Sequence, residues 1–241
     1  MTYIVLAAGK GSKLYPLTLN NPKTSYKLDE NTTVLQRIVR IIRKYDINAE
    51  IVVVVGYLSN FVKKELKDEN VIFVNNPFYE VTNSIASLWF ARDYLERENV
   101  TIIHGDVVFD DYLVKNYITK DTNYPYSFID SSVSEQGAYN VVLKNDSIIV
   151  MSKKIENFNA KYAYVSKFDA VSSRLLKKEV DEMIASNMYD QYYEDALVEM
   201  IMFKDFKLNY VDIKDHEWSE FDSVDDFFVA QEIHKKSAIR K

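Results

Sequence analysis

The 241-residue sequence contains no cysteine. Disulfide bonds and thiolate metal sites are therefore excluded, and we expect the protein to reside in the reducing cytoplasm. No apolar stretch approaches the roughly 20 residues that cross a bilayer. The N-terminus also lacks the charged segment and small-residue cleavage site of a signal peptide, so we expect neither secretion nor a membrane partner.

Basic residues are fewer than acidic ones: the sequence has 30 Lys and Arg and 36 Asp and Glu, which gives a net charge of −6. A nucleic-acid-binding protein would need a basic face, so we expect no nucleic-acid partner. The sequence has no internal repeat and no Gly/Ser/Pro linker. We therefore expect one domain over residues 1–236, followed by a frayed tail at 237–241; the sequence leaves the oligomeric state open.

Apolar runs that favour strands alternate with helical patterns in the first half of the chain. The expected strands are Tyr3–Ala8, Glu50–Val55, Val71–Val74, Val100–Ile103, Tyr126–Ile129, Tyr139–Leu143, Ile148–Met151 and Leu208–Ile213. The expected helices are Val34–Tyr45, Leu58–Leu66, Ser84–Arg97, Ser172–Ala185, Glu194–Phe203 and Val224–Lys236. This order predicts an α/β fold: a single-domain, Rossmann-like, mostly parallel mixed sheet with helices on both faces and a small antiparallel insertion.

Glycine is rare, yet two of the five glycines, Gly9 and Gly11, directly follow the first apolar run. A glycine-rich turn after a buried strand presents backbone N–H groups to an anion, so this turn predicts a phosphate cradle. The third glycine of a dinucleotide fingerprint is replaced by Leu14, and no Walker A loop is present. A dinucleotide-dependent oxidoreductase is therefore disfavoured.

The longer string Leu6-Ala-Ala-Gly-Lys-Gly-Ser-Lys-Leu-Tyr-Pro-Leu-Thr18, closed by Pro22-Lys23, resembles the signature of the nucleotidyltransferase superfamily. That superfamily includes sugar-1-phosphate nucleotidyltransferases and small bacterial cytidylyltransferases. The resemblance implies a GT-A-like nucleotidyltransferase fold and catalytic roles for Lys13 and Lys23. It implies nucleotide contacts for Leu6, Ala7, Ala8, Gly9, Gly11 and Ser12. Lys13 replaces the family's usual arginine, which keeps the charge but loses the planar fork.

Two later segments, Val54–Leu58 and Asn76–Leu88, resemble parts of phosphocholine and phosphonate cytidylyltransferases. There they frame the nucleobase, which implies nucleotide contacts for Gly56, Asn83 and Ser87. Asn83 is also a good helix N-cap, so a purely structural role stays open.

His104-Gly105-Asp106 follows an apolar strand, at the end where open α/β sheets bind ligands. The resemblance implies that Asp106 holds Mg²⁺ together with Asp222, and that Gly105 contacts the nucleotide. Asp222 is otherwise explained as an N-cap of the last helix. We expect His104 to face the other side of its strand.

The acceptor half carries less specific signals. Tyr193, Glu194 and Asp195 echo a family element beside the acceptor pocket, and aromatic rings next to carboxylates suit a cationic amine. An acidic helix N-terminus with core tyrosines explains the same residues equally well. Lys153 resembles a lysine that contacts the acceptor phosphate, although an exposed lysine is the simpler interpretation.

Lys161 and Tyr164 depart from the family, which often has a glutamate and a glycine at these positions before the Lys167-Phe168 pair. We expect both departures to affect the acceptor half alone, leaving the nucleotide half unchanged.

Together these features predict a cytidylyltransferase that uses CTP and Mg²⁺ to activate a small phosphorylated or phosphonylated amine. Phosphocholine and 2-aminoethylphosphonate are the leading acceptors, phosphoglutamine follows, and the family implies a place in cell-surface polysaccharide biosynthesis. The alternatives are a sugar-1-phosphate nucleotidyltransferase and, from another class, a nucleotide-binding pseudoenzyme.

Overall fold

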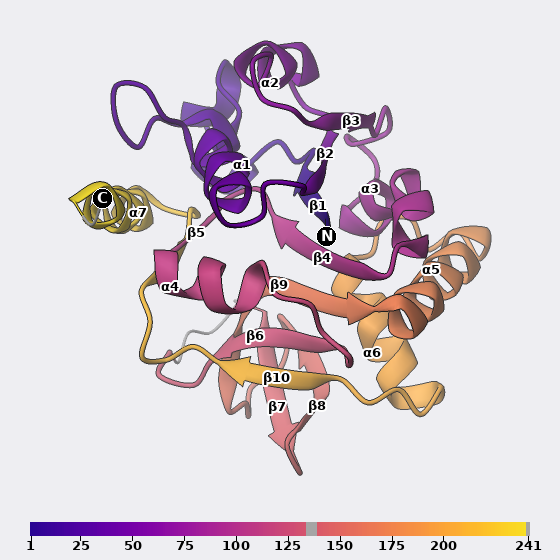
Figure 1. The fold of residues 1–241 in the computed structure, drawn as a ribbon. Coiled ribbons are helices and arrows are strands. Elements are labelled where there is room, and N and C mark those ends of the chain that lie inside the picture. The colour runs from indigo at the N-terminus through magenta and orange to yellow at the C-terminus, as the bar shows by residue number, and fades with distance from the viewer. Residues whose placement is uncertain (134–138, 240–241) are drawn as a thin grey trace.

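The computed structural model describes residues 1–133 and 139–239. Nine strands of this described part form the main sheet, in the order β10-β6-β9-β4-β1-β2-β3 with the β7–β8 hairpin attached to β9 (Figure 1). Their bounds are β1 Thr2–Ala7, β2 Glu50–Val55, β3 Ile72–Asn75, β4 Asn99–His104, β6 Tyr126–Asp130, β7 Asn140–Lys144, β8 Ser147–Ser152, β9 Ala160–Asp169 and β10 Asn209–Asp212. A second, two-stranded sheet pairs β5 (Val107–Phe109) with β11 (Trp218–Glu220).

The parallel part of the sheet joins β4, β1, β2 and β3, and β10 runs parallel to β6. β1 and β2 are almost completely buried along their lengths, as expected for apolar strands covered on both faces. The predicted mixed, mostly parallel α/β architecture is therefore confirmed. The expected antiparallel hairpin is also present, as β7 and β8.

Helices cover both faces of the sheet, with α1 and α4 on one side and α3, α5 and α6 on the other (Figure 1). The helices are α1 Val34–Tyr45, α2 Ser59–Glu65, α3 Ser84–Phe90, α4 Asp111–Leu113, α5 Ala170–Ala185, α6 Tyr193–Phe203 and α7 Val224–Ile239. Shorter 3₁₀ turns occupy Ser12–Leu14, Leu17–Leu19, Lys23–Ser25 and Arg92–Glu96, and a π turn occupies Val114–Ile118. No helix in the described part of the chain combines the length and apolar character needed to cross a membrane.

Helix bounds follow local capping signals where these are strong. α1 spans the predicted residues, because Thr33 accepts a hydrogen bond from the Gln36 amide and the Gln36 side chain accepts one from Thr33. The single helix expected over Ser84–Arg97 is instead divided into α3 and a 3₁₀ turn. α7 continues through Ile239, which corrects the start of the frayed tail expected at residue 237; residues 240–241 lie outside the described part.

β9 is the one long strand that the sequence pattern did not predict. It lies antiparallel between β4 and β6 at the centre of the sheet. Its polar side chains are nevertheless buried: Lys167 is fully enclosed and donates hydrogen bonds to the backbone carbonyls of Tyr117 at 3.0 Å, Ile118 at 2.8 Å and Lys120. The strand was missed because these polar residues interrupt the apolar run.

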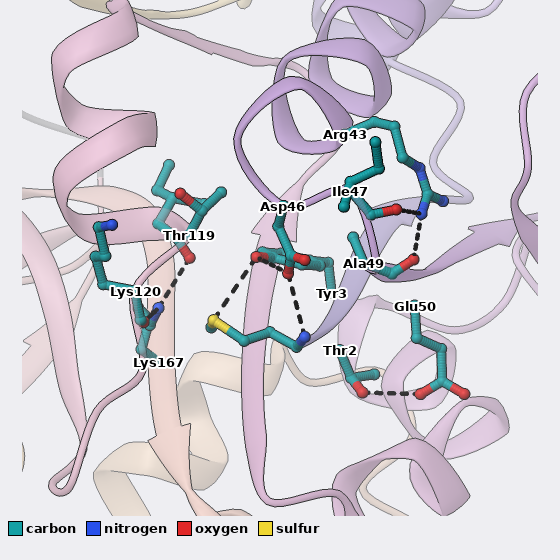
Figure 2. A network of polar contacts seen from close by, with 12 residues as sticks. Thr2, Tyr3, Arg43, Asp46, Ile47, Ala49, Glu50, Thr119, Lys120 and Lys167 are labelled. Atoms are coloured by element: carbon teal, nitrogen blue, oxygen red, sulfur yellow. Dashed lines mark hydrogen bonds and ion pairs between the residues drawn. The ribbon is translucent and has the colours of Figure 1, made fainter.

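Polar contacts secure the amino ends of the parallel strands, at the edge opposite to the carboxyl ends of β1 and β4. The Asp46 carboxylate accepts hydrogen bonds from the Tyr3 hydroxyl at 3.0 Å and from the terminal amine of Met1 at 3.1 Å (Figure 2). Nearby, Thr2 donates to Glu50 at 2.8 Å (Figure 2). This network joins the start of β1 to the end of α1 and the start of β2.

The Asp46 network predicts a measurable loss of stability for Tyr3→Phe. Removing the hydroxyl deletes one hydrogen bond to a charged group, so the free energy of unfolding should fall by about 1–2 kcal/mol in a urea titration. Tyr15→Phe is the matched control, because the Tyr15 side chain is exposed. An equal loss in both variants would contradict a specific role for the Asp46 contact.

Candidate active site

A cavity of about 410 Å³ opens at the carboxyl ends of β1 and β4. Fourteen of the residues singled out from the sequence line it: Leu6, Ala7, Ala8, Gly9, Gly11, Ser12, Lys13, Lys23, Asn83, Ser87, Asp106, Lys153, Glu194 and Asp222. The remaining four, Gly56, Gly105, Tyr193 and Asp195, are not among the lining residues. The fold thus brings together segments from both ends of the chain at one sheet edge, the position where α/β sheets bind ligands.

The glycine-rich turn is packed closely against the segment that carries Lys23. Gly11 has φ +66°, and a Cβ at this position would lie 2.9 Å from the Lys23 Cβ. Thr18 adds a hydrogen bond from its hydroxyl to the Gly11 carbonyl at 3.1 Å. Only glycine meets both the conformation and the spacing without strain, so Gly11 keeps Lys23 beside the turn.

Gly56 and Gly105 pack closely against the residues that lead into the same turn. A Cβ on Gly56 would lie 2.8 Å from the Ala8 carbonyl oxygen, and one on Gly105 would lie 3.0 Å from the Ala7 Cβ. Both glycines are thus closely packed against the backbone and do not line this cavity, and their nucleotide contacts stay a prediction.

Three carboxylates converge at the cavity, from Asp106, Glu220 and Asp222, with one oxygen of each lying within 4.8 Å of the others. The β5–β11 ladder explains how residues so distant in sequence meet. Glu220 pairs with Val107, and the Phe221 amide donates to the Asp106 carbonyl at 2.8 Å. The sequence analysis missed Glu220, which lies only two residues before Asp222. β11 ends at Glu220, and the turn that follows, closed by a hydrogen bond from the Asp222 amide to the Glu220 carbonyl at 3.0 Å, brings Asp222 into the same cluster.

Lysines compensate this negative charge. The Lys23 ammonium lies 2.6 Å from Asp106 and also contacts Asp222, which Lys13 contacts as well. Burial opposes ionisation, yet the two lysines lower the pKa of Asp222 to about 2. Glu220 behaves differently: burial, then the charges of Asp106 and Asp222, raises its pKa to about 7, even with Lys161 only 3.5 Å away.

Polar groups around the start of α3 line another part of the cavity wall. Asn83 caps α3 by accepting the Ser84 amide at 2.9 Å, so the structural alternative holds while the residue also lines the cavity. Asn76 donates to the Ser87 hydroxyl at 3.0 Å, which orients that hydroxyl. This wall therefore offers fixed amide and hydroxyl groups to a ligand.

His104 corrects an expectation, because its ring faces the cavity rather than away from it. His104 is the last residue of β4, and Asp106 follows in the adjoining turn; both side chains line the cavity. The His104 Nε2 lies 2.8 Å from Glu194 Oε1, and the Glu194 side chain is completely buried. Burial opposes protonation, but Glu194 raises the pKa of His104 above its usual value.

Tyr193 and Asp195, two of the expected acceptor residues, do not line the cavity, whereas Tyr139 and Tyr192 do. Asp195 accepts hydrogen bonds from the Tyr139 hydroxyl and the Tyr192 amide, both at 2.8 Å, and completes a capping box. Tyr193 is buried and bonds to other hydroxyl groups. The Lys153 ammonium lies 5.6 and 4.2 Å from the centroids of the Tyr139 and Tyr192 rings.

Lys161 and Tyr164, which were expected to affect the acceptor half alone, both contact the carboxylate cluster. Lys161 pairs with Glu220, and the Tyr164 hydroxyl also interacts with Glu220.

The geometry of the site indicates a class of enzyme. A glycine-rich turn suited to phosphate, adjacent lysines and clustered carboxylates together form a site for a nucleotide-transferring enzyme. The profile of the nucleotidyl transferase family matches residues 2–236. The chain belongs to the nucleotidyl transferase family, and it is a nucleotidyltransferase.

Within that family, the chain is similar to several cytidylyltransferases. The chain is 26% identical to choline-phosphate cytidylyltransferase of Streptococcus pneumoniae, over 98% of this chain and 99% of that protein. It is also 26% identical to CTP:phosphoglutamine cytidylyltransferase of Campylobacter jejuni, over 95% and 98% of the two chains. The solved CTP:phosphocholine cytidylyltransferase of S. pneumoniae has the same fold, with a TM-score of 0.77, 22% identity and coverage of 100% and 99%.

The packing behind the glycine-rich turn predicts that Gly56→Ala lowers stability. The added methyl group would overlap the Ala8 carbonyl and the Tyr79 side chain, each 2.8 Å away, so we expect a loss of about 1–3 kcal/mol in the free energy of unfolding. Gly9→Ala is the matched control, because its Cβ would have nothing within 4 Å. Equal stability of the two variants would show that the turn accommodates the methyl group.

Proposed function

We propose that the protein is a Mg²⁺-dependent cytidylyltransferase that transfers CMP from CTP to a small phosphorylated or phosphonylated amine. The observation that carries the proposal is the cluster of Asp106, Glu220 and Asp222, bridged by Lys23 beside the glycine-rich turn. The full-length similarity to two cytidylyltransferases supports the choice of CTP.

The carboxylate cluster fits a hard divalent cation. Mg²⁺ prefers one or two carboxylates together with phosphate oxygens, and Asp106 and Asp222 would hold it here. When bound, Mg²⁺ would neutralise charge on the nucleotide phosphates. Glu220 lies close enough to contribute through charge, although Lys161 and Tyr164 already engage it.

The chain's own groups then account for nucleotide binding. The N–H groups of the turn that contains Gly9 and Gly11 would donate hydrogen bonds to phosphate oxygens, as glycine-rich turns after a strand commonly do. Lys13 and Lys23 supply two positive charges beside the turn. Asn83 and Ser87 at the start of α3 lie where a nucleobase would find fixed polar partners.

The reaction needs no general base, because the acceptor phosphate or phosphonate oxygen is already anionic at neutral pH. This oxygen attacks the α-phosphorus of CTP in line and forms a new P–O bond. The bond between the α-phosphorus and the bridging oxygen breaks, and pyrophosphate departs with the electron pair. Lys13 and Lys23 stabilise the charge that develops on the transferring and leaving groups, so catalysis rests on positioning and charge neutralisation.

The acceptor half suits a cationic amine. Its walls carry the acidic side chain of Glu194 and the rings of Tyr139 and Tyr192, and aromatic faces attract cations. Lys153 already lies over these rings and is placed to contact the acceptor's phosphate or phosphonate group. These features support phosphocholine, 2-aminoethylphosphonate or phosphoglutamine over a neutral sugar phosphate.

Loss of either central charge should abolish turnover without unfolding the protein. We expect Lys23→Ala and Asp106→Asn each to lower kcat at least about a hundredfold. Lys27→Ala is the matched control, because Lys27 is exposed and lies outside the cavity. Circular dichroism would establish folding, and wild-type turnover in either site variant would refute the assigned roles.

The substrate assignment is tested by pyrophosphate release with Mg²⁺, crossing CTP, UTP, ATP and TTP with four acceptors. These are phosphocholine, 2-aminoethylphosphonate, phosphoglutamine and glucose 1-phosphate. We expect release with CTP and an amine-bearing acceptor, and loss of release when EDTA removes the metal. Release with glucose 1-phosphate alone would favour a sugar-1-phosphate nucleotidyltransferase, and nucleotide binding without any release would favour a pseudoenzyme.

A further inference from the structure

Tyr164 has an unusual backbone conformation for a residue inside a strand. Its φ is +58°, in the left-handed region that favours glycine, and within the described residues it is the only strand residue with a positive φ. The β6–β9 register shows the reason: Ser127 lies opposite Ser166, but Ile129 lies opposite Tyr162. Residues 163–165 of β9 therefore span the space opposite Phe128 alone, forming a bulge that re-aims the side chains within it.

This bulge directs the Tyr164 ring into the wall of the cavity. The ring centroid lies 5.0 Å from that of His104, 5.3 Å from that of Tyr162 and 6.5 Å from that of Trp218. The side chain is only 4% exposed, and its hydroxyl interacts with Glu220. Contacts on several sides therefore fix the ring in one position.

The ring contacts residues that the proposed function assigns to two parts of the site. Its hydroxyl interacts with Glu220 of the carboxylate cluster, where the reacting phosphates would bind. Its ring packs against His104, which is bonded to Glu194 in the proposed acceptor half. A rigid, buried ring at this position removes space that an acceptor would otherwise use.

We propose that Tyr164 determines acceptor specificity by limiting acceptor size, so that the site takes short phosphate or phosphonate amines and rejects longer or sugar-sized acceptors. This inference rests on the proposed function, because it concerns the acceptor of that reaction. Tyr164 acts by occupying volume, and its strained backbone holds the ring in that volume.

The wild-type enzyme provides the first test, through a series of ω-aminoalkylphosphonates from aminoethyl to aminopentyl, with glucose 1-phosphate as the bulky member. With CTP and Mg²⁺, we expect kcat/KM to fall at least about tenfold between the shortest and longest chains. Equal kcat/KM along the series would overturn the inference while leaving the proposed function intact. No pyrophosphate from this series, from phosphocholine or from phosphoglutamine would instead refute the proposed function.

Variants at position 164 then identify the cause of the limit. Tyr164→Gly should reduce the ratio of kcat/KM for short over long acceptors at least about tenfold, whereas Tyr164→Phe, the matched control, should keep the wild-type limit. An unchanged ratio in Tyr164→Gly, or an equal reduction in Tyr164→Phe, would overturn the inference.

A further pair of variants separates volume from backbone strain. Tyr164→Ala removes nearly the same volume as Tyr164→Gly but keeps a Cβ at φ +58°. We therefore expect the alanine variant to unfold at a lower temperature than the glycine variant while both widen the acceptor range. A widened range in the glycine variant alone would contradict the size argument.

Discussion

The ion pairs that Lys23 makes with Asp106 and Asp222 are the interaction on which the rest of the site depends. Carboxylate oxygens within 4.8 Å of one another repel strongly in a partly buried setting, so Asp106, Glu220 and Asp222 need nearby positive charge. Lys23 supplies it from the N-terminal segment, and it thereby connects the glycine-rich turn to the C-terminal strand. The first and last parts of the chain are thus held at one sheet edge.

The same charge arrangement explains how an acidic protein binds anionic substrates. The net charge of −6 gives no long-range attraction for a nucleotide, so binding depends on local groups. Lys13 and Lys23 concentrate positive charge beside the glycine-rich turn, and Glu194 and the rings of Tyr139 and Tyr192 also line the cavity. The cavity wall therefore carries positive charge beside the turn and acidic and aromatic groups as well.

Local signals in the sequence predicted those features whose causes are local. The capping box at Thr33 fixes the start of α1, and the spacing of Gly9 and Gly11 after an apolar run indicates the phosphate-binding turn. β9 was not predicted because its sequence contains Lys161 and Lys167, which do not fit an apolar strand pattern. Both lysines are buried in the fold, where their partners come from segments far away in the sequence. The role of Glu220 likewise depends on the β5–β11 pairing, which no short window of sequence contains.

Tyr164 adopts a backbone conformation that non-glycine residues usually avoid, and its contacts in the site explain why. A non-glycine residue in the left-handed region costs about 1–3 kcal/mol, and such strain persists only where surrounding contacts exceed it. Each favourable aromatic pair contributes about 0.5–1.5 kcal/mol, so the contacts with His104, Tyr162 and Trp218 are together of sufficient size to offset the cost. Glycine would remove the strain but would also lose the ring. The chain thus keeps a strained residue in the cavity wall beside the carboxylate cluster, which is the position from which the proposed limit on acceptor size would act.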